Sequence, residues 1–175
     1  LEKLTRSLLT LNELDMKKRM MHIHRFDIND TIQNTAATFE GTCAGRQIRL
    51  ELLLSGRELY VRADMEQIQQ VLYNLLDNAI KFSHDCSSIQ IETTVKNGRV
   101  FVSVKDHGSG ISKDNISKIW DRFYKIDASR GKDRKGTGLG LSIVKEIINA
   151  HNQNIDVIST EGVGTEFIFT LEKAK

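Results

Sequence analysis

The stretch Val71-Leu72-Tyr73-Asn74-Leu75-Leu76-Asp77-Asn78-Ala79-Ile80-Lys81-Phe82 decides how this chain folds. Its apolar residues recur at the three- and four-residue spacing of a helix, and Asp64 stands before it as a candidate N-cap, so we expect a helix over about 65–82. Asn74 and Asn78 are four residues apart and share a face beside the leucine stripe. A buried amide needs hydrogen-bond partners, so this pair indicates a polar site at the edge of the core.

The polar face of this helix carries groups suited to a metal and to phosphate. The side-chain carbonyl of an asparagine is a hard oxygen ligand for Mg²⁺, which takes few protein ligands and keeps waters and phosphate oxygens. Lys81 lies three residues after Asn78 and can reach the same phosphates. Taken alone, the segment also fits an ordinary helix with two surface asparagines and a solvated lysine.

A second motif, Asp106-His107-Gly108-Ser109-Gly110, follows a predicted strand that ends near Val104. An ionised carboxylate only accepts hydrogen bonds. Adenine presents an amino donor where guanine presents a carbonyl, so a buried Asp106 would favour ATP and reject GTP. Gly108 and Gly110 would let the backbone approach a flat base or adopt positive φ. An ordinary Asp-Gly turn is the alternative for this motif alone.

A third motif, Gly136-Thr137-Gly138-Leu139-Gly140-Leu141, precedes an apolar helix and would expose backbone N–H groups to an anion. No Gly-Lys-Ser/Thr follows it, which excludes a Walker loop, and no strand leads into it as in a Rossmann turn. Residues 125–135 carry five cations and two anions. This charge fits a lid over a triphosphate, and a solvated charged loop is the alternative.

The rest of the chain predicts helices mixed with short strands. Strands are expected near 23–27, 48–52, 59–61, 89–95, 100–104, 155–159 and 166–171. Helices are expected from a cap at Asn29 or Asp30 to about Ala44, over 139–150, and briefly near 112–120. Asn97-Gly98 predicts a type I′ hairpin turn. The expected fold is an α/β (α+β) two-layer sandwich, in which about three helices cover one face of a mixed, mostly antiparallel sheet.

Composition narrows the function classes. The chain has 175 residues and a net charge of +2, which gives no strong field for nucleic acid or a membrane. Cys43 and Cys86 follow no metal or redox spacing, which favours a reducing, cytoplasmic setting. No apolar run approaches the roughly 20 residues of a membrane helix. The chain starts at Leu1 rather than Met, so we expect a piece of a longer protein.

The motifs, in this order, identify a resemblance. Residues from about 26 to 171 resemble the ATP-binding catalytic domain of bacterial two-component sensor histidine kinases, which has a Bergerat (GHKL) fold shared with DNA gyrase B. The likeness also includes Trp120-Asp121-Arg122-Phe123-Tyr124, where Trp120 replaces a more usual phenylalanine. It closes with Gly162-Val163-Gly164-Thr165-Glu166-Phe167.

The resemblance implies roles for individual residues. Asn78 would hold Mg²⁺, Asn74 would support it or order a water, and Lys81 would touch phosphate. Asp106 would bind the adenine amino group, and Thr165 would back the base. The other residues implied to bind ATP are Phe82, Gly108, Gly110, Ile111, Phe123, Tyr124, Lys125, Arg130, Gly136, Thr137, Gly138, Leu139, Gly140 and Leu141. Of all these, Asn74 and Lys81 are the catalytic candidates.

The resemblance also implies the reaction and its partners. The chain would bind Mg-ATP and donate the γ-phosphate to a histidine on a dimerisation domain, for relay to a response-regulator aspartate. Leu1, Leu4, Leu8 and Leu11 share a helix face, so residues 1–22 would be the remnant of the dimerisation hairpin helix and a linker. A helix packed on its own domain is the alternative for this stripe. Residues 23–175 would be the ATP-binding domain. No histidine here has the phosphoacceptor context, so the acceptor would lie upstream and this piece alone would not autophosphorylate.

Other functions remain open from the sequence. The chain could be a module that binds ATP without transferring phosphate, although intact Asn78, Asp106 and glycines oppose a degenerate site. It could also be a serine kinase of the anti-sigma type or a chaperone-like ATPase on the same fold. The leucine stripe and the phenylalanine motif disfavour both, and hydrolysing relatives carry a glutamate where this chain has Asn74. We expect no nucleic-acid partner and no membrane contact by this piece.

Overall fold

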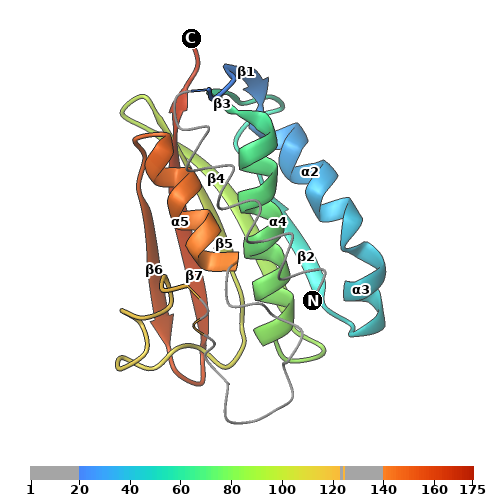
Figure 1. The fold of residues 1–175 in the computed structure, drawn as a ribbon. Helices are drawn as coiled ribbons and strands as arrows, with labels where there is room; N and C mark the ends of the chain where they lie inside the picture. The colour runs from blue at the N-terminus through green and yellow to red at the C-terminus, as the bar shows by residue number, and fades with distance from the viewer. Residues whose placement is uncertain (1–19, 123, 125–139) are drawn as a thin grey trace.

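The structure is a computed structural model that describes residues 20–122, 124 and 140–175 (Figure 1). The expectation for residues 1–19 therefore lies outside the described residues. The elements, in chain order, are β1 (Ile23–Asp27), α2 (Ile28–Thr38), α3 (Glu40–Gly45), β2 (Arg49–Leu53), β3 (Tyr60–Asp64), α4 (Met65–Phe82), β4 (Ser88–Lys96), β5 (Arg99–Lys105), α5 (Gly140–Ala150), β6 (Ile155–Thr160) and β7 (Gly164–Lys173).

The strands of the described residues form one sheet of seven, in the order β1-β3-β7-β5-β4-β2, with β6 also paired to β7. Strand β7 is central: β5 runs along one edge, while β6 and then the end of β3 occupy the other. Every pairing is antiparallel except β2 with β4. Helices α2, α4 and α5 lie over one face of the sheet (Figure 1), which confirms the expected two-layer fold.

The core lies between this helical layer and the sheet. Helix α4 buries the leucine stripe read from the sequence together with its neighbours, and the full set is Ile68, Val71, Leu72, Leu75, Leu76, Ala79 and Ile80. These side chains meet α5 and the inward residues of the central strands, among which Val102 and Phe169 are fully buried. Burial of one such side chain contributes about 1.5–3 kcal/mol, so α4 is held mainly by this stripe.

Both ends of α4 fall where the sequence placed them. Asp64 caps the helix, since its Oδ1 accepts a hydrogen bond from the backbone N–H of Gln67 at 3.3 Å, and the helix ends at Phe82. The hairpin between β4 and β5 also forms as expected. Asn97 and Gly98 adopt φ of 53° and 76°, as a type I′ turn requires.

The expected helix from 29 or 30 to 44 was wrong at its start and in its middle. Asp27 is the N-cap of α2, because its Oδ1 accepts from the N–H groups of Asn29 at 3.0 Å and Leu59 at 2.9 Å. Asn29 is instead buried inside the first turn, where it bonds Ser55 and Thr93. The helix also breaks at Phe39, which separates α2 from α3. The short helix expected near 112–120 is a run of turns.

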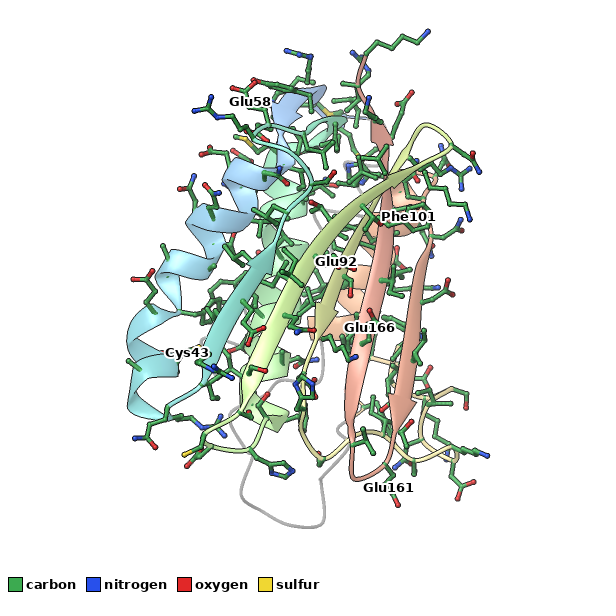
Figure 2. The ribbon with its side chains drawn as sticks, turned by 180° about the vertical axis from the view of Figure 1, so that it is seen from behind. Cys43, Glu58, Glu92, Phe101, Glu161 and Glu166 are labelled. Atoms are coloured by element: carbon green, nitrogen blue, oxygen red, sulfur yellow. The ribbon has the colours of Figure 1, made fainter. Side chains whose placement is uncertain are left out.

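The opposite face of the sheet carries charged side chains beside apolar ones (Figure 2) and has no helix over it among the described residues. Figure 2 shows Glu92, Phe101 and Glu166 on this face. The hydroxyl of Ser103 donates to Glu166 there at 2.6 Å. No helix in the described part of the chain is both long and apolar enough to cross a membrane.

The two faces lead to a stability prediction. Val102 pairs with Phe169 and Phe101 pairs with Thr170, so the two phenylalanines point to opposite faces. Phe169→Ala should lower the free energy of unfolding by about 3–5 kcal/mol, because it empties a fully buried site. Phe101→Ala, on the open face, is the matched control and should cost clearly less. Urea unfolding measures both, and equal losses would contradict this placement of the core.

Candidate functional site

A pocket opens where the C-terminal half of α4 meets the segment after β5 and the start of β7. About 310 Å³ of space free of protein atoms lies within it, part of which is open to solvent. The residues that line it are Asn78, Phe82, Asp106, Gly110, Ile111, Leu141, Thr165 and Phe167. All but Phe167 are residues that the sequence predicted as ligand-binding. Four segments that are far apart in the chain thus converge as expected.

Asp106 is the buried charge of the pocket. Asp106 comes directly after β5 in the chain and is 5% exposed. Its Oδ1 accepts hydrogen bonds from the N–H of Gly108 at 3.0 Å and of Thr165 at 3.2 Å. Among the described residues, Oδ2 makes no hydrogen bond. One carboxylate oxygen is therefore fixed by the backbone, while the other remains for a donor in the pocket.

Burial dominates the electrostatics of this carboxyl group. Desolvation raises the pKa of Asp106 above its ordinary value, while the two backbone N–H groups and the nearby His107 and His84 lower it in part. The ionised form is therefore costly to the folded state unless a donor reaches it. A buried carboxylate in a pocket, with its pKa raised by desolvation, is typical of a binding or catalytic site.

Thr165 lies beside Asp106 in a small hydroxyl network. Its backbone carbonyl accepts from the N–H of Asp106 at 2.8 Å, and its Oγ1 lies 2.8 Å from the Oγ of Ser159. The Ser159 hydroxyl also accepts from the N–H of Ile111 at 2.7 Å. No signal in the sequence marks Ser159, because only the β6–β7 register places it opposite Thr165.

Three glycines around the pocket allow close approach of backbone segments. A Cβ at Gly108 would overlap the carbonyl of Phe82, and a Cβ at Gly164 would overlap that of Asp106. Gly110 adopts φ of +70°, and a Cβ there would overlap the carbonyl of Thr160. The expected positive φ at Gly110 is confirmed, and the space that each missing side chain leaves is filled by protein backbone.

The asparagine face of α4 divides into two environments. Asn78 is half-buried and lines the pocket. Asn74 is one turn away, where its Nδ2 donates to the carbonyl of Gly140 at 3.2 Å and its Oδ1 accepts from Gln70 at 2.9 Å. The ammonium of Lys81 lies 3.0 Å from the carboxylate of Asp77. The structure thus brings Asn78 to the pocket wall and ties Asn74 to the start of α5.

The aromatic motif after the turns packs behind the pocket. Trp120 meets Phe167, a pocket residue, edge to face with 5.8 Å between ring centroids. Tyr124 is half-buried against the core. The remaining predicted contacts lie outside the described residues: Phe123, Lys125, Arg130, Gly136, Thr137, Gly138 and Leu139. Phe167 belongs to the motif at 162–167 quoted from the sequence, which was the available signal for it.

Sequence comparison finds relatives of this arrangement. The family model for histidine kinase-, DNA gyrase B- and HSP90-like ATPases matches residues 63–175. The sensor histidine kinase WalK of Bacillus subtilis (strain 168) is 36% identical over 173 residues, which cover 97% of this chain and 28% of WalK. The chain therefore spans about 28% of the length of that relative.

Solved structures of histidine kinases have the same fold as this chain. The catalytic domain of histidine kinase ThkA matches with a TM-score of 0.77 and 32% identity, over 87% of this chain and 97% of that one. ThkA in complex with the response regulator TrrA matches with a TM-score of 0.78 and 28% identity, over 99% of this chain and 49% of that one. Full-length ShkA in complex with AMPPNP matches with a TM-score of 0.86 and 25% identity, over 98% of this chain and 36% of that one.

The chain belongs to the family of histidine kinase-, DNA gyrase B- and HSP90-like ATPases. Within it, the fold and the sequence are those of the catalytic domains of sensor histidine kinases, so the resemblance read from the sequence is confirmed.

The glycine packing can be tested by a matched pair of substitutions. Gly110 and Gly98 both have positive φ, so alanine at either costs about 1–2 kcal/mol in backbone strain. Only at Gly110 would the new Cβ overlap backbone, since nothing lies within 4 Å at Gly98. Gly110→Ala should therefore lower the free energy of unfolding by about 1–3 kcal/mol more than Gly98→Ala does. Chemical denaturation compares them, and equal losses would contradict the close approach to Thr160.

Proposed function

We propose that this chain is the ATP-binding catalytic domain of a sensor histidine kinase and that its pocket binds the adenine of ATP. The observation that carries the proposal is the carboxylate of Asp106, whose Oδ1 is held by two backbone N–H groups while Oδ2 remains for a donor. The adenine amino group is such a donor. Guanine would set a carbonyl oxygen against the carboxylate, which is repulsive.

The walls of the pocket suit a purine ring. Phe82, Ile111, Leu141 and Phe167 are apolar, so the ring would be enclosed by apolar side chains with polar groups at one edge. The Thr165 hydroxyl, held by Ser159, would supply a second polar contact beside Asp106. This combination of an apolar slot and one oriented carboxylate supports recognition of adenine in particular.

The α4 face next to the pocket fits the magnesium and phosphate part of the ligand. Asn78 offers a carbonyl oxygen at the pocket wall, which is a suitable ligand for Mg²⁺. Within the described residues, no group of three His, Cys, Asp or Glu side chains is placed so that it could hold a metal ion. An ion there would take its other ligands from phosphate and water. Lys81 would exchange its partner Asp77 for a phosphate oxygen.

The proposed reaction is transfer of the γ-phosphate to a histidine on a dimerisation domain, followed by relay to a response-regulator receiver domain. Residues 1–22 would link the two domains, and residues 23–175 would form the ATP-binding one. The proposed reaction would take place in the cytoplasm, because it consumes ATP. The complex of ThkA with TrrA supports a response regulator as partner. This chain's own part is to bind, orient and neutralise charge.

A hydrolytic ATPase is the second candidate, and Asn74 disfavours it. Activation of water by proton transfer needs a general base, which an amide cannot be. Asn74 is moreover engaged on both atoms of its amide, with Gln70 and Gly140. Its place in the described structure is that of a tie between helices, which favours phosphate transfer over rapid hydrolysis.

Asp106→Asn tests the adenine contact. The two backbone N–H groups would retain the Oδ1 of the amide, so its NH₂ would take the place of Oδ2 and face the adenine NH₂, donor against donor. Calorimetric titration should show ATP affinity weaker by about 10- to 100-fold, for a loss of about 1.5–3 kcal/mol. The wild type should bind ATP in preference to GTP.

The control for this substitution is Asp156→Asn on the exposed part of β6. It should leave ATP affinity unchanged. Asp106→Asn should also be at least as thermally stable as the wild type at pH 7, because it removes a desolvated charge. A folded wild-type chain that fails to bind ATP, or a variant that binds as well as wild type, would overturn the proposal.

The raised pKa of Asp106 gives a pH dependence. ATP affinity should fall as pH falls through that pKa, because a proton on Oδ2 replaces the acceptor that adenine needs, and the fall should begin above the ordinary aspartate range. The free energy of unfolding changes with pH in the opposite direction. The folded state binds the proton more tightly than the unfolded state, so the contribution of Asp106 is largest at low pH and is lost as pH rises through the folded pKa.

Titrations at several pH values measure this dependence. Asp106→Asn in the same buffers accounts for the titration of ATP itself, so only the difference between the two proteins is read. The stability advantage of the variant at neutral pH should shrink as pH falls. A difference in ATP affinity that does not change with pH would show that the charge of Asp106 is not needed.

A further inference from the structure

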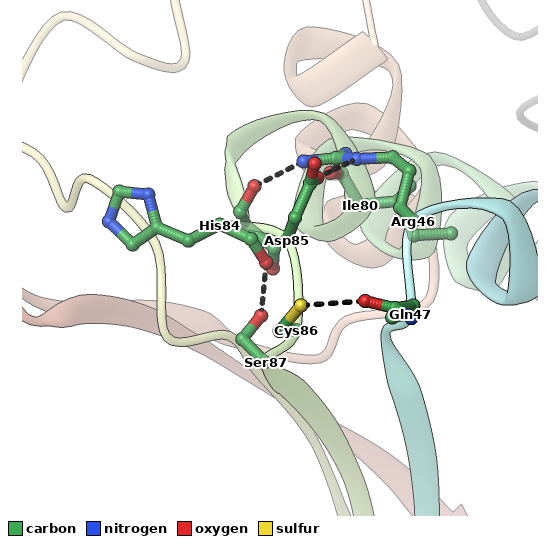
Figure 3. A network of polar contacts seen from close by, with 8 residues as sticks. Arg46, Gln47, Ile80, His84, Asp85, Cys86 and Ser87 are labelled. Carbon is green, nitrogen blue, oxygen red and sulfur yellow. Dashed lines mark hydrogen bonds and ion pairs between the residues drawn. The ribbon is translucent and has the colours of Figure 1, made fainter.

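Arg46 lies outside the pocket but reaches the helix that forms its wall. It is the C-cap residue of α3, and its side chain is one third exposed. Figure 3 shows the guanidinium extending to the end of α4. It donates from Nη1 to the carbonyl of Ile80, from Nη2 to the carbonyl of Ser83 at 2.5 Å, and from Nε to Asp85 at 2.8 Å.

These carbonyls belong to the last turn of α4 and the residue after it. The last four carbonyls of a helix have no partner within it, and a cation there also complements the helix dipole. Arg46 therefore acts as a C-terminal cap supplied from another element. The backbone of Arg46 is also held by this segment, because the N–H of Cys86 donates a hydrogen bond to the carbonyl of Arg46 at 3.1 Å.

The same turn of α4 contacts the Asp106–Gly110 loop on its other side. The carbonyl of Phe82 accepts from the N–H of Ser109 at 3.2 Å and fills the space beside Gly108. Ser83, whose carbonyl Arg46 holds, forms an isolated β-bridge with Gly108. Phe82 itself lines the pocket. The end of α4 is thus fixed between the guanidinium and the loop that carries Asp106.

We propose that Arg46 is a positioning residue of the nucleotide site, which holds the last turn of α4 so that Phe82 and Lys81 face the ligand; this rests on the proposed function. Arg46 acts through the backbone of α4 and does not touch the nucleotide. Its planar fork matches the two carbonyls and Asp85 together, which a lysine ammonium cannot do from one position. The junction between α3 and β2 would in this way determine how well ATP binds.

The experiment compares Arg46→Gln, Arg46→Lys and Asp85→Ala. ATP affinity by calorimetry should weaken about tenfold in Arg46→Gln, which loses charged hydrogen bonds to the helix end. Arg46→Lys should recover part of that loss. Asp85→Ala is the matched control, because it removes only the exposed ion pair and leaves both carbonyl bonds, so its affinity should equal that of the wild type.

Amide hydrogen exchange supplies a readout that needs no nucleotide. The N–H of Ser109 donates to the carbonyl of Phe82, so its exchange should accelerate about tenfold in Arg46→Gln, while that of Val102 in β5 should not change. A purely structural cap would lower the melting temperature and leave the ATP affinity of the folded variant, and the exchange of Ser109, unaltered.

The outcomes separate the two proposals. A wild type that binds no ATP overturns the proposed function. A wild type that binds, with an Arg46→Gln variant that is folded and binds equally, overturns the positioning role alone. Equal losses in Arg46→Gln and Asp85→Ala also overturn it, because they would assign the effect to the exposed ion pair. Should Arg46→Gln not fold, Arg46→Lys against Asp85→Ala decides the matter by the same two readouts.

Discussion

The pocket depends on backbone segments that approach more closely than any side chain would allow. Phe82 at the end of α4, Thr160 at the end of β6 and Asp106 after β5 each place a carbonyl where a glycine lacks its Cβ. The turn that carries Asp106 is therefore enclosed by main chain. Protein interiors deform little, so this contact transmits the position of α4 and of the β6–β7 hairpin to the carboxylate.

The buried carboxylate is costly where it stands, and this cost fits a binding role. Desolvation raises the pKa of Asp106, and the backbone N–H groups of Gly108 and Thr165 offset only part of that effect. A residue chosen for stability alone would carry no charge here. Strained or destabilised groups that the rest of a fold holds in place are typical of functional sites, and the core of α4 supplies the stability that offsets this one.

The sequence predicted the features whose signals are local. Both ends of α4 follow from a cap and a period, and the Asn97-Gly98 turn follows from two residues. The N-cap of α2 was misplaced because Asn29 is engaged by Thr93, which is distant in sequence. The role of Gly108 and the contributions of Ser159 and Arg46 needed the three-dimensional register, since each partner is on another element.

Helix α4 connects the parts of the site because each of its faces has a different partner. The leucine stripe packs into the core, Asn74 bonds Gly140 at the start of α5, Asn78 meets the pocket, and the last turn contacts both the Asp106 loop and Arg46. Gly140 belongs to the glycine motif that leads into the first turn of α5, so one helix touches both glycine motifs. A shift of α4 by a fraction of a turn would alter every one of these contacts together. Helix α4 therefore relates the position of the two glycine motifs to each other and to the core.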